Sequence, residues 1–136
     1  MKTLEFVPYK SIGVVNFGMH REDVRQNFGD YSEFKKTELS NNTTDDFGFI
    51  HAYYDDNNML EAVECFGEAK IMFNNVDIMA LNIKQLKLFF ETQSIEYITD
   101  ESGLQTDGVG ISAYIPDITN DKEAKVETLL LFRKGY

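Results

Sequence analysis

The sequence predicts an α+β fold in which an antiparallel sheet of about eight strands carries two short helices on one face. Three observations predict it. Short apolar runs with the alternation of strands recur along the chain, two segments show helical spacing instead, and the second half looks like a weakened copy of the first. Eleven Phe and seven Tyr residues with no Trp also favour a core rich in strands.

The similarity of the two halves lies in their spacing. Six positions keep their residue class when 62 is added to their numbers, and one of the six pairs consists of glycines that lie between large apolar residues. The spacing predicts a tandem repeat of two similar units, over 12–67 and 74–135, within one domain that spans 1–136. The alternative is that any small α+β chain can be divided into two broadly similar halves. The six positions are Val14, Val24, Phe28, Gly48, Phe49 and Asp55, and their counterparts are Val76, Leu86, Phe90, Gly110, Ile111 and Asp117.

The first half begins with strands and then changes to helical spacing. Apolar runs predict short strands over 4–7 and 12–17. Apolar residues at helical intervals, with charged residues between them, predict an amphipathic helix over 20–28, with His20 as an unusual capping residue. Gly29 is placed to end this helix, because glycine adopts the left-handed backbone of a helix cap.

The rest of the first half reads as strands and turns. Residues 31–38 fit a strand with mixed faces, and the polar run over 40–46 predicts a loop. The segments 47–54 and 60–66 are predicted to be antiparallel partners. The turn between them, 55–58, contains only Asp and Asn, which tolerate left-handed backbone angles.

The second half repeats this order of elements. Asn82 and Gln85 form a capping pair, and the apolar face made by Ile83, Leu86, Phe89 and Phe90 predicts a helix that runs to about Thr92. Loops are predicted over 100–108 and 117–125. The predicted strands are 71–73, 76–78, 95–99, 109–115 and 126–132, the last with apolar residues on both faces.

Composition restricts the class of protein. The 136 residues are 43% hydrophobic, as in ordinary globular domains, and a single cysteine, Cys65, excludes an intramolecular disulfide. The chain has 23 acidic and 13 basic residues, which give a net charge of −10. This charge disfavours binding to nucleic acid and would attract a basic protein or a cationic ligand. The alternative is that the charge serves solubility alone. Since the start of the sequence is no secretory signal and no apolar run could cross a membrane, we expect a cytoplasmic protein without membrane contact.

The sequence offers little catalytic chemistry. His51 and Cys65 lie on neighbouring predicted strands and form the only possible nucleophile–base dyad, although each is more simply a buried or half-buried strand residue. The run 55–58 is similar to the start of a calcium loop, but its twelfth position is Phe66 instead of Glu. No zinc signature or phosphate-binding glycine loop is present. We therefore expect a non-enzymatic protein with neither metal nor cofactor.

The stretch Ile12–Gly29 contains a pattern found in bacterial proteins: the step Gly18-Met19, a helix with Asp23-Val24, and a closing glycine. It resembles the start of the first helix in the small lipoproteins that assist outer-membrane barrel assembly. It is also similar to β-lactamase inhibitory protein, whose fold is a tandem repeat of helix and antiparallel sheet. The resemblance implies a scaffold that binds proteins. Two features depart from the pattern: no lipobox cysteine precedes the helix, and His20 replaces the usual Ser or Thr cap.

Tyrosines and carboxylates interleave around one predicted hairpin. Tyrosine rings supply buried area at protein interfaces, and carboxylates steer and orient a basic partner. Each acid could equally be an ordinary surface charge, and each tyrosine a sheet residue of the core. The predicted partner-binding residues are Tyr53, Tyr54, Asp55, Asp56, Glu61 and Glu64, together with three acids in predicted loops, Asp45, Asp46 and Asp107.

These features together predict a protein-binding module, monomeric or homodimeric. Its general character resembles the bacterial immunity proteins, which are often acidic because many of their nuclease targets are basic. The most concrete prediction is a small acidic cytoplasmic inhibitor or immunity protein that lays its sheet over the basic active site of a partner. The alternative is a small-ligand-binding or sensor domain with a pocket between helices and sheet.

Overall fold

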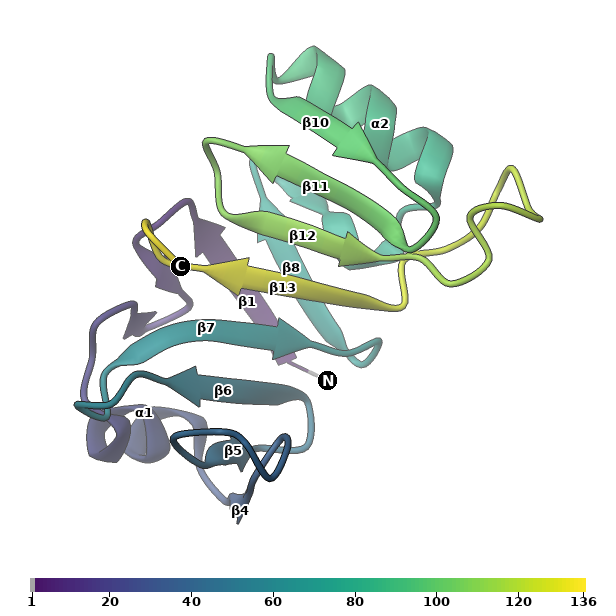
Figure 1. The fold of residues 1–136 in the computed structure, drawn as a ribbon. Helices are drawn as coiled ribbons and strands as arrows, with labels where there is room; N and C mark the ends of the chain where they lie inside the picture. The colour runs from purple at the N-terminus through teal and green to yellow at the C-terminus, as the bar shows by residue number, and fades with distance from the viewer. Residues whose placement is uncertain (1) are drawn as a thin grey trace.

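The structure, a computed structural model, describes residues 2–136 and contains two β-sheets and two α-helices (Figure 1). The larger sheet has eight antiparallel strands in the order β10-β11-β12-β13-β7-β6-β5-β4, which confirms the predicted α+β class and the large antiparallel sheet. Its strands are β4 (Ser32–Phe34), β5 (Thr44–Asp46), β6 (Ile50–Tyr54), β7 (Leu60–Cys65), β10 (Glu96–Thr99), β11 (Gly103–Asp107), β12 (Ile111–Tyr114) and β13 (Thr128–Phe132).

These eight strands form two four-stranded meanders that meet at the centre of the sheet. Strands β4 to β7 pair in chain order, and so do β10 to β13. The last strand of each meander, β7 and β13, pair with one another, with Cys65 opposite Leu129 and Val63 opposite Leu131. The inward side chains of both strands are fully buried, so this one pairing turns two small sheets into a single broad one.

A smaller five-stranded sheet lies behind the large one (Figure 1). Its centre is the parallel pair of β1 (Lys2–Val7) and β8 (Ala69–Phe73), which brings the start of the chain beside its middle. The outer strands are very short, because the chain turns sharply between them. They are β2 (Ser11–Ile12), β3 (Val15–Asn16) and β9 (Val76–Asp77).

Both helices end where the sequence predicts. Helix α1 spans Arg21–Phe28 and is followed by Gly29 with a φ of 97°. Helix α2 spans Ile83–Thr92, after a 3₁₀ turn at Ile78–Ala80, and begins with the predicted capping box, in which Asn82 and Gln85 each accept the backbone N–H of the other.

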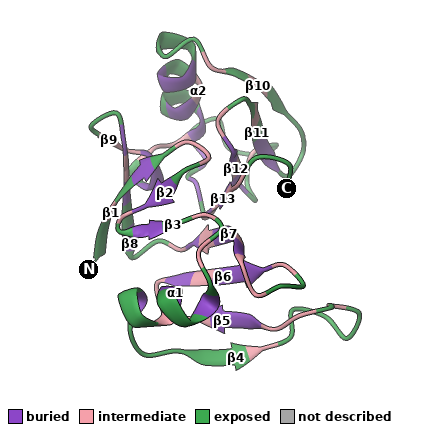
Figure 2. Cartoon of the chain, turned by 90° about the vertical axis from the view of Figure 1, so that its left-hand side faces the viewer, coloured by how far each residue is buried: buried purple, intermediate pink, exposed green. Residues whose placement is uncertain are grey.

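The helices and the small sheet cover the same face of the large sheet, and the hydrophobic core lies between these layers (Figures 1 and 2). Buried side chains such as Ile50, Leu60 and Leu131 point from the large sheet into this core. Across the gap they meet the apolar sides of the helices, including Val24 and Phe90. Among residues 2–136, no helix or strand covers the opposite face of the large sheet, so this face is open to solvent or to a partner (Figure 1).

Two strands of the large sheet lie where the sequence predicts loops. Strand β5 falls within the predicted loop 40–46, and β11 falls within the predicted loop 100–108. Both are polar and lack the alternation of hydropathy by which a strand is recognised. The prediction that Asp45, Asp46 and Asp107 lie in loops is therefore wrong, because all three are paired in the sheet.

Two predicted strands are shorter than expected because glycines bend the chain. The segment 12–17 is divided at Gly13, which has a φ of 61°, so that its two ends belong to the separate short strands β2 and β3. Strand β6 begins at Ile50 instead of Phe47, since the chain turns at Gly48, where φ is 88°.

Each half of the chain places its helix before its meander. The N-cap residues His20 and Asn82 lie 62 positions apart, and each forms an isolated antiparallel bridge, to Met59 and to Lys125 respectively. The helix pairs Val24 with Leu86 and Phe28 with Phe90 are all buried. Gly48 and Gly110 both have positive φ angles and both precede the third strand of their meander.

The turn before β12 offers a test of one close approach. A Cβ added at Gly110 would lie 2.5 Å from the carbonyl oxygen of Phe132, whereas a Cβ at Gly108 would meet open space. Both glycines have positive φ angles, so both Ala variants carry backbone strain. We expect Gly108→Ala to lower the free energy of unfolding by about 1 kcal/mol and Gly110→Ala by about 2–4 kcal/mol in urea denaturation. Equal losses would contradict the packing of β13 against this turn.

Candidate functional site

A cavity of about 380 Å³ opens at the end of the first meander. Its walls come from the β4–β5 loop, the end of β6 with the turn that follows, Glu61 on β7, and Tyr136. Five of the nine predicted partner-binding residues line this cavity: Tyr53, Tyr54, Asp55, Asp56 and Glu61. The other lining residues are Lys36, Ser40, Asn41, Asn42, Thr43, Thr44 and Tyr136.

Tyr53 forms an aromatic wall of the cavity on the open face of the sheet. Its hydroxyl donates a 2.9 Å hydrogen bond to Glu64, which brings a sixth predicted residue next to the cavity. Burial, together with the negative charge of Glu64, raises the pKa of the Tyr53 phenol, so the ring stays neutral. The ammonium group of Lys36 lies 4.7 Å from the centre of this ring.

The acidic wall of the cavity contains Asp55, whose carboxylate is fixed by several hydrogen bonds, and Glu61, which is less constrained. Asp55 accepts the backbone N–H groups of Asn57 and Met59 and a hydrogen bond from Arg133, and the bond from Met59 contributes most to lowering the pKa of Asp55. Burial raises the pKa of Glu61, although Arg133 lies 3.4 Å away and favours the charged form. Arg133 therefore bridges two of the carboxylates that line the cavity.

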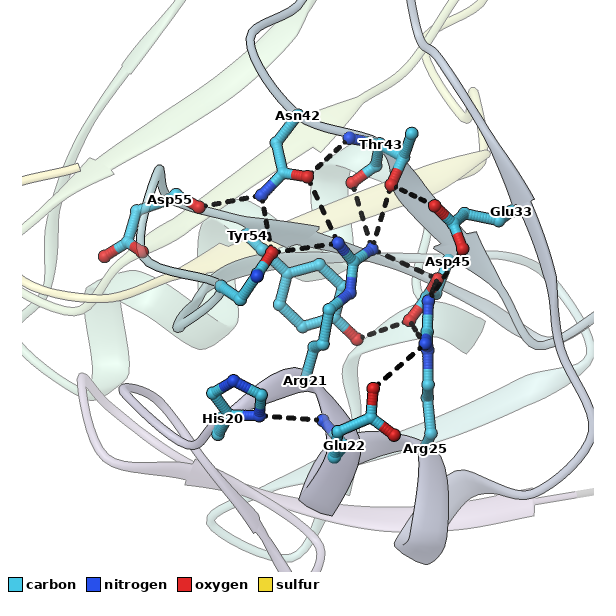
Figure 3. Close-up of polar contacts among 11 residues, drawn as sticks. His20, Arg21, Glu22, Arg25, Glu33, Asn42, Thr43, Asp45, Tyr54 and Asp55 are labelled. Carbon is cyan, nitrogen blue, oxygen red and sulfur yellow. Dashed lines mark hydrogen bonds and ion pairs between the residues drawn. The ribbon is translucent and has the colours of Figure 1, made fainter.

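Beneath the cavity, Asp45 is fully buried between two arginines of helix α1 (Figure 3). Arg25 donates to both carboxylate oxygens of Asp45, at 2.7 and 2.9 Å, and Arg21 donates to one at 3.3 Å. The hydroxyl of Tyr54 adds a 2.9 Å bond. Burial alone would raise the pKa of Asp45, but the bonds from Arg25 and Tyr54 and the charge of Arg21 outweigh it, so the pKa lies below its ordinary value. The assignment of Asp45 to partner contact is corrected, because the residue cannot be reached from outside.

Arg21 links this buried carboxylate to the walls of the cavity (Figure 3). One nitrogen of its guanidinium donates to Asn42 and Asn58, and the other terminal nitrogen donates to Thr43. The guanidinium also lies 4.3 Å from the centre of the Tyr54 ring. Because Asn42 belongs to the β4–β5 loop and Asn58 to the β6–β7 turn, Arg21 fixes the distance between two walls.

Two further predicted residues have other surroundings. Asp46 lies on the open face and does not line the cavity; it lies 3.3 Å from His51, which also lies 3.8 Å from Glu64. Asp107 is exposed at the end of β11, and in the order of the sheet β12, β13 and β7 stand between it and β6. It lines a different cavity, of about 550 Å³, along β10 and β11.

The two arginines of helix α1 were not predicted to belong to the site. They were grouped with the charged residues outside the apolar stripe of the helix, whereas Arg21 is only 7% exposed and Arg25 is half-buried. A signal was present: Arg21, Arg25 and Phe28 are separated by four and three residues, so they share a helix face with Val24. Asn42 and Thr43 carried no such signal, because only their contact with Arg21 distinguishes them from other loop residues.

The geometry separates the two residues of the possible dyad. Glu64, not Cys65, is the register partner of His51 on β7, so the His51 side chain lies on the open face while Cys65 points into the core. Burial raises the pKa of the Cys65 thiol, which keeps it protonated. No nucleophile–base pair forms between these two residues.

Within residues 2–136, no cluster of three or more His, Cys, Asp or Glu side chains is placed to hold a metal ion. Neither of the two helices described there has the length and hydropathy needed to cross a membrane.

The chain matches no protein-family model, and no curated protein or solved structure is significantly similar to it. The geometry and charge of the cavity therefore carry the functional inference: neutral aromatic faces beside carboxylates bind cations.

Replacing Asp45 by Asn tests the buried charge cluster. The variant leaves two guanidinium groups facing a neutral amide, so we expect a loss of about 3–5 kcal/mol in the free energy of unfolding at pH 7. Because the folded-state pKa of Asp45 lies below its ordinary value of 3.8, the stabilisation is complete above that pH and is lost as the pH falls through the lower folded-state value. The difference in the free energy of unfolding between wild type and Asp45→Asn should therefore begin to narrow as the pH falls below about 4 in urea denaturation.

The matched control is Asp107→Asn, which removes the same charge from an exposed position. We expect it to change the free energy of unfolding by less than about 0.5 kcal/mol at any pH tested. If Asp45→Asn costs no more than this control, the cluster does not stabilise the fold.

Proposed function

We propose that this chain is a non-enzymatic protein-binding module: a small acidic inhibitor or immunity protein of the cytoplasm that occludes a basic partner. The observation that carries the proposal is the convergence of Tyr53, Asp56 and Glu61 in one cavity at the edge of an uncovered sheet face. Aromatic rings beside carboxylates offer both contact area and orientation to a basic surface.

The open face next to the cavity supports the proposal because it offers apolar area. Leu130 and Phe132 on β13 are half-buried on this face, and Tyr114 on β12 is 45% exposed. Tyr136 stacks on Phe132 and lines the cavity, so apolar surface continues from the end of β13 to the acidic wall. A partner seated on the cavity would therefore also cover apolar side chains, as stable interfaces require.

We also propose that the two halves are a tandem repeat, as in β-lactamase inhibitory protein, which the sequence resembles. The shared order of helix and meander supports this. So do the N-cap residues His20 and Asn82, each of which forms an isolated bridge, and the glycines at the equivalent positions 48 and 110. In such an arrangement, fusion of the two meanders through β7 and β13 produces a surface broader than either half could offer.

A second candidate function, binding of a small ligand, is favoured by the volume of the cavity. About 380 Å³ lies within the range of roughly 300–1,000 Å³ that ligand pockets occupy. None of the residues that line this cavity belongs to a helix, so such a ligand would not lie between helices and sheet. A polar, cationic metabolite is the class that its walls fit best.

The two candidates are separated by capture and by kinetics. The immobilised protein is incubated at low salt with a lysate of its source organism, and the captured protein is purified and assayed. We expect a basic partner whose own activity is lost at one equivalent of this chain. Its association rate should fall about tenfold or more between about 50 and 500 mM NaCl, because attraction between opposite charges is screened.

The proposed function would be contradicted by a captured protein that is acidic, that keeps its activity in the complex, or that associates at a rate independent of salt. A thermal shift with a cationic metabolite, and none with any protein, would favour the second candidate instead.

A further inference from the structure

The cavity already holds one cation of the chain itself. Lys36 comes from the exposed β4–β5 loop, and its ammonium group lies over the ring of Tyr53. Within residues 2–136 Lys36 forms no ion pair with a carboxylate, so this single contact with the ring holds it. Tyr53 is only 8% exposed although it belongs to the open face. A group held this weakly at the mouth of a cavity can be displaced by a stronger competitor.

The charges around the cavity are not fully paired, so a competing cation could still bind there. Three carboxylates line it, and Arg133 is shared by Asp55 and Glu61. In the described part of the chain Asp56 has no ion-pair partner, and it lies at the exposed turn that lines the cavity. A ligand with one positive charge would replace the charge of Lys36 and could pair with Asp56, which Lys36 does not contact.

We propose that an arginine or lysine side chain of a basic polypeptide partner inserts into this cavity, displaces Lys36 from the ring of Tyr53, and pairs with Asp56 and Glu61. Long basic side chains have the required shape, with an apolar stem for the rings of Tyr53 and Tyr136 and a charged end for the carboxylates. The inference rests on the proposed function, since it names the group by which the basic partner would be recognised.

The test uses two basic probes, acetyl-hexaarginine amide and acetyl-hexalysine amide, titrated into the whole protein and followed by calorimetry and by NMR. Lys36→Met removes the internal competitor, and we expect it to tighten binding of the probes about two- to fivefold. The matched control is Lys35→Met, which removes the same charge from the adjacent exposed residue and should change the affinity by less than about 1.5-fold. Ring signals of Tyr53 and Tyr136 should shift on titration.

A second pair of variants separates the cavity from the general acidity of the protein. Asp56→Asn with Glu61→Gln, and Glu96→Gln with Asp107→Asn, remove two negative charges each, the first pair at the cavity and the second at the far end of the sheet. We expect the first pair to weaken the probes about tenfold and the second about twofold or less. Circular dichroism and melting curves establish that each variant is folded.

Equal losses in the two double variants, no gain from Lys36→Met, or no binding of either probe at about 20 mM NaCl would overturn the inference. Its failure is distinguishable from failure of the proposed function. If a protein partner is captured and the probes do not displace it, the proposed function is supported and the insertion of a basic side chain is contradicted. If the probes bind at the cavity but no protein partner is captured, the cavity is supported as a site for basic side chains and the proposed function is contradicted.

Discussion

A carboxylate buried between two guanidinium groups holds helix α1 against the sheet, and the shape of the cavity depends on it. Asp45 lies on a three-residue strand near the edge of the sheet, where backbone pairing alone is a weak anchor. Its bonds to Arg21 and Arg25 fix the helix, and the remaining bonds of Arg21 fix the loop and the turn above. A buried charge cluster is expensive to desolvate, so the intact cluster contributes more to geometry than to net stability, although removing one of its members is costly.

The same cluster explains why the two halves differ in chemistry despite their common order of elements. At the positions 62 residues after Arg21 and Asp45 stand Ile83 and Asp107. Ile83 is 4% exposed and packs in the core, while Asp107 is exposed. Helix α2 is therefore held to its meander mainly by apolar contact, with one side-chain hydrogen bond from the hydroxyl of Tyr97 on β10 to Glu91. Helix α1 instead uses a polar network that also organises the loops beside it. The cavity and its charges belong to the first half for this reason.

The sequence predicted those parts of the fold in which local chemistry decides the structure. Helix α2 carries its own capping box and apolar face, and the turn after Tyr54 carries its own Asp and Asn residues, so the residues from Tyr53 to Glu61 could be placed together in advance. Strands β5 and β11 were missed, since a polar strand exists only through its neighbours. The burial of Arg21 was missed because hydropathy ranks arginine with the surface, and the parallel pair of β1 and β8 because nothing local specifies partners so far apart.

The position of β13 has a consequence for how the molecule is made. It is the last strand in chain order, yet it sits in the middle of the large sheet, between β7 and β12. During synthesis on the ribosome the first meander can be complete while one side of β7, a strand with four fully buried or nearly buried side chains in the finished protein, still lacks its hydrogen-bonding neighbour. Such an unpaired border attracts other nascent chains. Until residue 132 emerges, β7 is therefore the border of the first meander at which such pairing with another chain would occur.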